Sequence, residues 1–380
     1  MASPLLFRAI DKDRIAFIDI GRALAALLVF YSHLAEPWIR RRGEDAPYVD
    51  VVEALTSEPM LMAQQGIGQI AVPFFFLVSG FVVTPIALRQ GQARFTVNRT
   101  IRVYAPLAFT VALTVALMAA HLGVPSTGQA QTVTPASVLS NATLANYLMI
   151  PQVVLVPVAW TLIIEVAFYA MLIVLIPLLR RSVWLAIGVE LTFVFVTLMS
   201  ARAFGPHWFL VAVTVSYLPI LIIGQAIWAA STGRIPTWAG WVFVGGAWSL
   251  YVLADRMDMG RIDNAYNLAL AFAVICFLMG MFAEPKLRQR KFWVALSERS
   301  YSLYLLHMLV SFVILEALRP QVPLPLALVA AVVGTFAVVE ISYRLVERPS
   351  HRLARALSRR PRRTPDPAAD AASAATQGIA

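Results

Sequence analysis

The chain has 380 residues, of which 59% are hydrophobic and 14% are charged, and its mean hydropathy is +0.72. Soluble domains carry about 25% charged residues, so these values exclude a soluble globular protein and indicate a polytopic membrane protein. The formal net charge is +10, but the arginines cluster between hydrophobic segments, which is typical of membrane topology and not of nucleic-acid binding. The single cysteine, Cys276, excludes an internal disulfide and a cysteine metal site.

Ten apolar segments have the length of about 17 to 25 residues that a helix needs to cross a bilayer. The sequence therefore predicts an all-α fold, a polytopic membrane bundle of about ten transmembrane helices. The weakly apolar stretch 136–156 is expected to form a loop or a re-entrant piece. The predicted spans are 15–35, 69–88, 103–122, 157–179, 183–200, 208–230, 238–254, 266–282, 300–318 and 324–343.

The distribution of Lys and Arg predicts that both termini are cytoplasmic. With that orientation, 23 of the 31 basic residues fall in cytoplasmic segments and seven in outer loops, as the positive-inside rule requires. We expect a cytoplasmic segment at 1–14, a transmembrane domain at 15–350, and a disordered cytoplasmic tail at 351–380, which is basic and then rich in Ala and Pro. The first segment lacks a small-residue cleavage site, so we expect it to remain as a span.

The first span contains two polar residues that lipid does not favour. Arg22 and His33 lie 11 residues apart, which places them within roughly 20° on one helix face and about 16 Å apart along the axis. An Arg at a helix centre costs about 2.5 to 3.5 kcal/mol on insertion, so the pair indicates a functional site. The alternative is that Arg22 extends to the interface while His33 packs. Asp19 lies in the same segment.

Further polar groups fall in or beside other spans, where such residues mark functional sites by default. They are Ser79 in FFFLVSGFVV, Arg99 and Arg102 in RFTVNRTIRVYAP, Trp160 and Glu165 in AWTLIIEVAFYAM, and Ser302, Tyr304 and His307 in RSYSLYLLHMLV.

Together these stretches resemble the acyltransferase 3 family of integral membrane acyltransferases. The matching elements are the Arg-x10-His pair, the Phe-rich run at 74–80, the segment 160–169, the segment 300–307 and the Leu-Val-Glu-Arg-Pro at 345–349, in the family's order. The chain departs from many members at Thr161, Val166 and Ala167, and it has no room for a C-terminal esterase-like domain. Such a resemblance implies an O-acyltransferase that moves an acyl group, usually acetyl from cytoplasmic acetyl-CoA, to a sugar hydroxyl of an envelope or exported glycan.

Within this interpretation, His33 is the candidate general base, because the pKa of imidazole lies near working pH. The helical rise places Glu165 between Arg22 and His33 in depth. Glu165 would then hold the tautomer of His33, and Arg22 would pair with Glu165 or stabilise the negative charge on the thioester oxygen. An acyl-histidine intermediate is the competing mechanism.

The remaining candidates are expected to bind the donor or to shape the path. Arg99 and Arg102 would bind the phosphates of coenzyme A, with Ser302 and His307 as further donor contacts; His307 is expected about 10 Å above the cytoplasmic face, and a packed core histidine is the alternative there. The candidates for structural or pore-lining positions are Asp19, Ser79, Trp160 and Tyr304. We predict no metal site and no tightly bound cofactor, with acetyl-CoA as co-substrate.

The expected setting is the inner membrane of a bacterium, with a glycan acceptor, the lipid bilayer and glycan-assembly proteins as partners, and no nucleic acid. Two alternatives remain open from the sequence. Intramembrane charges also mark transporters or flippases of glycan export, and family relatives also modify small hydrophobic molecules such as macrolides.

Overall fold

The computed structural model describes residues 14–62, 65–126, 128–260, 266–319 and 321–358. Within these ranges, nine helical segments are long and apolar enough to cross a membrane, and Val183–Met199 is a shorter apolar helix. These ten segments correspond to the ten expected spans, and the all-α helix bundle is confirmed. The expected segment 1–14 lies outside the described residues except for Arg14, and the expected tail lies outside them beyond residue 358.

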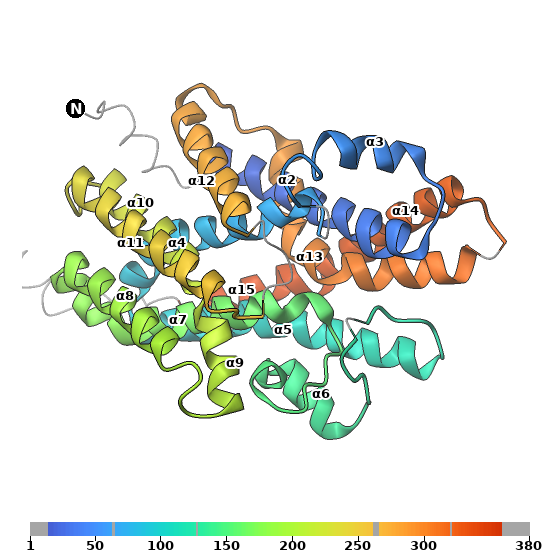
Figure 1. Cartoon of the computed structure of the whole chain (residues 1–380), viewed down its shortest axis with the longest axis horizontal. Helices are drawn as coiled ribbons and strands as arrows, with labels where there is room; N and C mark the ends of the chain where they lie inside the picture. Colours follow the sequence, from blue (N-terminus) through green and yellow to red (C-terminus); the bar gives the residue numbers. More distant parts are fainter. Residues whose placement is uncertain (1–13, 63–64, 127, 261–265, 320, 359–380) are drawn as a thin grey trace, which may run out of the picture.

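Most of the helices follow one another with short connections, and a longer loop joins α5 to α6 (Figure 1). The long helices are α2 (Ala16–His33), α4 (Ala71–Gln90), α5 (Gln92–Ala119), α7 (Trp160–Arg181), α8 (Val183–Met199), α10 (Leu218–Ser231), α11 (Thr237–Arg256), α12 (Tyr266–Ala283), α13 (Lys291–Leu318) and α14 (Leu324–Ser342). The shorter helices are α3 (Pro47–Leu55), α6 (Pro135–Ala142), α9 (Pro206–Val215) and α15 (Arg348–Leu357), together with the 3₁₀ turns η2 (Ile67–Ile70), η3 (Ala145–Leu148), η4 (Pro157–Ala159) and η5 (Glu284–Lys286) and the π-helices η1 (Leu34–Arg40) and η6 (Tyr343–Glu347).

Local sequence explains two irregular regions. The span expected at 208–230 is broken into α9 and α10 at Ser216 and Tyr217, and Pro219 occupies the first turn of α10, where its missing N–H does no harm. The weakly apolar stretch 136–156 forms a short helix, a 3₁₀ turn and an extended return. This stretch is therefore a structured loop and does not cross the bundle as a long helix.

Helices α4 and α10 pack backbone against backbone at the centre of the bundle. A side chain added at Gly80 would overlap the carbonyl oxygen of Leu221, and one added at Gly224 would overlap that of Leu77. In membrane proteins, small residues where two helices cross allow the helix backbones to approach this closely. The Ser-Gly of the Phe-rich motif therefore serves helix packing through its glycine.

Replacing Gly80 with Ala is expected to destabilise the protein by about 1 to 3 kcal/mol, because the obstructing atoms are backbone and can move only if the two helices separate. Thermal unfolding of the purified protein in detergent, followed by size-exclusion chromatography, measures the effect. Gly245 is the matched control, because it lies in α11 with nothing within 4 Å of an added methyl group. An unchanged melting temperature for Gly80→Ala would contradict the close crossing.

Helix α13 connects the first and last parts of the chain, because it packs against both α2 and α14, and Figure 1 shows α13 and α14 side by side. At the end of the bundle where α2 begins, Arg14 pairs with Glu298 at 2.9 Å, and Tyr343 donates a hydrogen bond to the same carboxylate at 2.8 Å. The start of α2 and the start of η6 therefore lie at one end, which we call the N-terminal end of the bundle.

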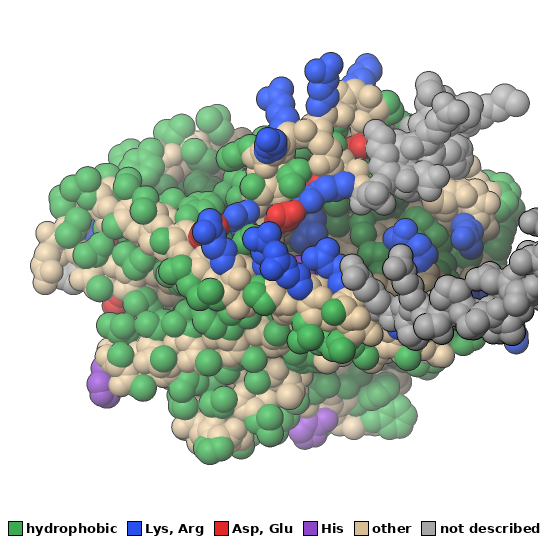
Figure 2. Space-filling view, turned by 180° about the vertical axis from the view of Figure 1, so that it is seen from behind, with side chains coloured by type: hydrophobic (Ala, Val, Ile, Leu, Met, Phe, Trp, Pro, Cys, Tyr) green, Lys and Arg blue, Asp and Glu red, His purple; other side chains and the backbone are tan. Residues whose placement is uncertain are grey.

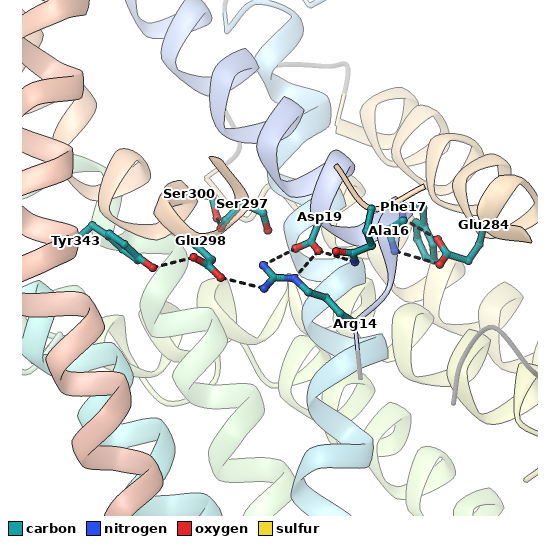
Figure 3. A network of polar contacts seen from close by, with 10 residues as sticks. Arg14, Ala16, Phe17, Asp19, Glu284, Ser297, Glu298, Ser300 and Tyr343 are labelled. Carbon is teal, nitrogen blue, oxygen red and sulfur yellow. Dashed lines mark hydrogen bonds and ion pairs between the residues drawn. The ribbon is translucent and has the colours of Figure 1, made fainter. Parts of the chain in front are cut away.

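A carboxylate from another helix caps α2 at this end (Figure 3). The residue before α2, Ile15, has no side chain that could cap it. Instead Glu284, buried at 3% exposure, accepts hydrogen bonds from the backbone N–H groups of Ala16 at 3.1 Å and Phe17 at 2.8 Å. The carboxylate satisfies donors that a helix start leaves free and complements the positive end of the helix dipole.

Replacing Glu284 with Ala is expected to cost about 2 to 3 kcal/mol of stability, because it leaves two buried N–H groups without an acceptor. Glu284→Gln keeps one neutral acceptor and should fall between Ala and the wild type. Thermal melts of the three proteins test this order. Glu58, whose side chain is 47% exposed and contacts Arg40, supplies the control variant Glu58→Ala, which should melt close to the wild type.

Candidate active site

A cavity of about 300 Å³ opens inside the bundle between α2, α4, α5, α7, α13, η6 and α15. Most of its wall is apolar, with Phe75, Phe76 and Val82 among the lining residues. Lys and Arg side chains gather in the middle of the face seen in Figure 2, with a few carboxylates among them. The ionisable residues that line the cavity are Arg22, Arg99, Arg102, Glu165, Tyr169, Tyr301, Tyr304, Glu347 and His351.

Arg99 and Arg102 line this cavity, and both lie inside α5, which begins at Gln92, and not in the basic loop expected before a span at 103–122. The Nε and Nη2 atoms of Arg99 are buried and lack a hydrogen-bond partner among the described residues. Its guanidinium lies over the rings of Tyr169 at 5.2 Å and Phe95 at 5.3 Å, which fixes its position without using its N–H groups. Arg102 lines the same cavity one helical turn further on. Buried guanidinium nitrogens that lack an acceptor, such as these two of Arg99, indicate a site for an anionic ligand.

Glu165 also lies in the cavity, but its partners differ from those expected. Its Oε1 accepts a hydrogen bond from Ser79 at 3.0 Å and another from the hydroxyl of Tyr169. The guanidinium of Arg22 donates instead to Ser300 at 3.1 Å. Arg22 and Glu165 thus face one cavity, but in the described chain the expected Arg22–Glu165 pair is replaced by hydrogen bonds to neutral partners.

His33 pairs with the other intramembrane histidine. The Nε2 of His307 lies 3.3 Å from the Nδ1 of His33, and the ring centroids are 4.9 Å apart. The Nδ1 atoms of the two rings also face backbone carbonyls, of Val29 at 2.8 Å and Leu303 at 3.0 Å. The expectation that Glu165 orients His33 is therefore not met, because Val29 and His307 occupy the Nδ1 side of that ring.

The hydrogen bonds assign the tautomers of this pair. A carbonyl oxygen only accepts, so each Nδ1 carries the proton in the neutral rings. The Nε2 of His307 is then an acceptor for the Nδ1–H of His33, and the Nε2 of His33 keeps its lone pair. His33 is half-buried. Its Nε2 lone pair is the proton acceptor that a general base requires.

The predicted depth of His307 is wrong because α13 is longer than the apolar pattern indicated. The helix begins at Lys291 and not near residue 300. His307 lies 16 residues into it, about 24 Å from its start. It therefore meets His33 near the end of α2, and neither histidine is among the residues that line the cavity.

Ser302, expected to contact the donor, is turned toward a buried carboxylate. Glu347 is 2% exposed and accepts hydrogen bonds from the hydroxyl of Ser302 at 2.6 Å and from its backbone N–H at 3.2 Å. Glu347 ends the π-helix η6 and lines the cavity. Sequence reasoning assigned Glu347 no role, although the Leu-Val-Glu-Arg-Pro motif that contains it was the available signal.

His351, which falls in the expected tail, also lines the cavity from α15. The helix continues to Leu357, past the expected domain boundary at residue 350. Sequence reasoning treated the basic composition after 350 as a tail, whereas the described residues form a helix that packs on α5.

The candidates for structural or pore-lining positions lie in three different environments. Asp19 is buried at the N-terminal end, where it pairs with Arg14 at 2.7 Å and accepts a hydrogen bond from Gln289 at 3.1 Å. Trp160 packs on the ring of Tyr217, at 5.4 Å between centroids, away from the central cavity. Ser79 and Tyr304 line that cavity, and Thr161 donates a hydrogen bond to the hydroxyl of Tyr304 at 2.9 Å.

The fold and the site together define a class: a polytopic membrane helix bundle with a cationic cavity and a pair of intramembrane histidines. The family model described as "Acyltransferase domain" matches residues 15–344, and this chain belongs to that acyltransferase 3 family. It is therefore a membrane acyltransferase. It is similar to "Nodulation protein 10" of Rhizobium leguminosarum bv. viciae, with 26% identity over 372 residues, covering 88% of this chain and 93% of that protein. No solved structure gives a significant match.

Proposed function

We propose that this enzyme transfers an acetyl group from cytoplasmic acetyl-CoA to a hydroxyl of an envelope or exported glycan in the bacterial inner membrane. The observation that carries the proposal is the pair of buried, unpartnered nitrogens of Arg99 inside a cavity that Arg22 and Arg102 also line. Three guanidinium groups around one space suit a ligand with several phosphate oxygens, because the planar donor pairs of Arg match such oxygens.

The shape of the cavity suits the two chemically different parts of the donor. The arginines would bind the phosphates, and the apolar wall with Phe75 and Val82 would accommodate the less polar arm that carries the thioester. Arg22 lies about 16 Å from His33 along α2. Arg22 is therefore too far from His33 to stabilise the negative charge on the thioester carbonyl at which His33 acts. The distance favours a phosphate-binding role for Arg22.

The reaction would take place at the far end of the donor, near the histidine pair. The acceptor hydroxyl oxygen attacks the thioester carbonyl carbon while its proton moves to Nε2 of His33. The carbon–sulfur bond breaks, and the coenzyme A thiolate leaves and takes that proton from the imidazolium. His307 and the carbonyl of Val29 accept the Nδ1–H of His33 throughout, so they orient the ring and stabilise its charged form.

This path brings donor and acceptor from opposite ends of the bundle. The arginines lie toward the N-terminal end, which the positive-inside rule places in the cytoplasm, and His33 lies at the far end of α2. Family membership supports an enzyme over the alternative of a carrier. We expect glycan-assembly proteins to deliver the acceptor.

Purified protein in nanodiscs, supplied with radiolabelled acetyl-CoA and a panel of glycans, tests the proposal. Label should pass to a glycan with release of free coenzyme A, and both should stop in His33→Ala. Label that stays on the protein without an acceptor would support an acyl-histidine intermediate instead of direct transfer. Folded protein that neither binds nor consumes acetyl-CoA would refute the donor.

A further inference from the structure

The last helical segment of the described chain is longer than the hydrocarbon core of a bilayer is thick. Residues Leu324–Leu357 form one helical segment of 34 residues, which at about 1.5 Å per residue is about 51 Å long. The hydrocarbon core is about 30 Å thick. Because η6 lies at the N-terminal end of the bundle, beside Glu298, α15 continues into the headgroup region at that end.

One face of α15 belongs to the donor cavity. Ser350 and Ala354 are buried, and α15 packs against α5, the helix that carries Arg99 and Arg102. His351 on the same side lines the cavity next to Glu347. Helix α15, held on α5, therefore forms part of the cavity wall at this end.

The outer face of α15 has the pattern of a helix at a membrane surface. Arg348, Arg352 and Arg355 are exposed and fall within roughly 60° around the helix axis. On a separate stripe, Leu353 and Leu357 are 53% and 60% exposed. The basic and apolar stripes lie about 150° apart around the axis, and such opposite faces are typical of helices that bind anionic lipids at the interface.

We propose that this basic stripe of α15 docks on anionic phospholipid headgroups, and that docking holds α15 against α5 and so tightens binding of the donor. The second part rests on the proposed donor site. The direction in which anionic lipid changes the affinity for coenzyme A tests this coupling, because an anionic membrane surface repels an anionic ligand. Without the coupling, anionic lipid should weaken binding of coenzyme A.

The experiment compares the full chain in nanodiscs of phosphatidylcholine with nanodiscs that also contain phosphatidylglycerol. Hydrogen exchange of the α15 amides reports docking, and equilibrium binding of coenzyme A reports coupling. We expect phosphatidylglycerol to slow exchange in α15 and to tighten coenzyme A binding by about 5- to 20-fold, a modest coupling between two sites. The triple variant R348Q/R352Q/R355Q should lose both effects and retain the wild-type affinity in phosphatidylcholine.

A second triple variant controls for general charge. Arg288, Arg290 and Lys291 are exposed and precede or begin α13 at the same end, and R288Q/R290Q/K291Q should behave like the wild type. Equal exchange of α15 in the two lipids would overturn the docking, and slower exchange without tighter binding would overturn the coupling. If coenzyme A binds in neither lipid, the proposed donor site fails, whereas the exchange data still decide the docking.

Discussion

Replacing Arg99 with Gln is expected to raise the KM for acetyl-CoA by about 30-fold or more, the effect of removing one partner of a buried charged hydrogen bond. The same variant should be at least as stable as the wild type. The guanidinium leaves its buried Nε and Nη2 without an acceptor among the described residues, and buried donors without an acceptor are costly to folding. Steady-state kinetics and a thermal melt of one preparation measure both effects.

The control for this prediction is Arg89→Gln, because Arg89 is exposed in the last turn of α4, and its KM should stay within about twofold of the wild type. Arg99→Lys adds a second comparison. It keeps the charge but loses the planar pair of donors, so it should bind the donor less well than the wild type and better than Gln. A normal KM in Arg99→Gln would place the phosphates elsewhere.

Replacing His33 with Ala is expected to lower kcat by about 100- to 10,000-fold, the usual contribution of a general base, and to leave the affinity for coenzyme A unchanged. We expect kcat and affinity to respond differently because His33 contacts His307, and neither histidine is among the residues that line the donor cavity. Binding of coenzyme A and transfer of radiolabel, measured on the same variant, distinguish the two effects.

His207→Gln is the matched control, because this histidine is exposed and contacts only the carbonyl of Leu148 in the described structure. Its kcat should equal that of the wild type. His307→Gln should retain more activity than His307→Leu, since Gln can still accept the Nδ1–H of His33. If His33→Ala retains its kcat, both the general-base and the acyl-histidine mechanisms fail.

Properties that depend on a single helix were predictable from the sequence. Segment length and hydropathy located the spans, although α5 begins at Gln92, before the span expected at 103–122, and so contains Arg99 and Arg102. Ser79 was a candidate for a structural or pore-lining position, and its neighbour Gly80 makes the close approach to Leu221. In each case the relevant residues are neighbours along the chain, where geometry is fixed by the backbone alone.

Properties that depend on which helices touch were not predictable. His33 and His307 are 274 residues apart, and spacing within a helix carries no information about its neighbours. The predicted depth of His307 was wrong for a different reason. Glu298 and Arg299 interrupt the apolar residues near the start of α13, so the predicted span began only at residue 300 although the helix begins at Lys291. Glu347 was missed because a π-helix turns it inward, and no helical period predicts that turn.

The capping of α2 by Glu284 has a consequence for the order in which the protein is made. The helix that carries His33 is synthesised first, but its cap lies 268 residues later, and its histidine partner follows after the cap. During most of translation α2 must therefore reside in the membrane with its first N–H groups uncapped and its histidine unpaired. The histidine pair is completed only when nearly the whole chain has been inserted, so a prematurely terminated chain cannot assemble it.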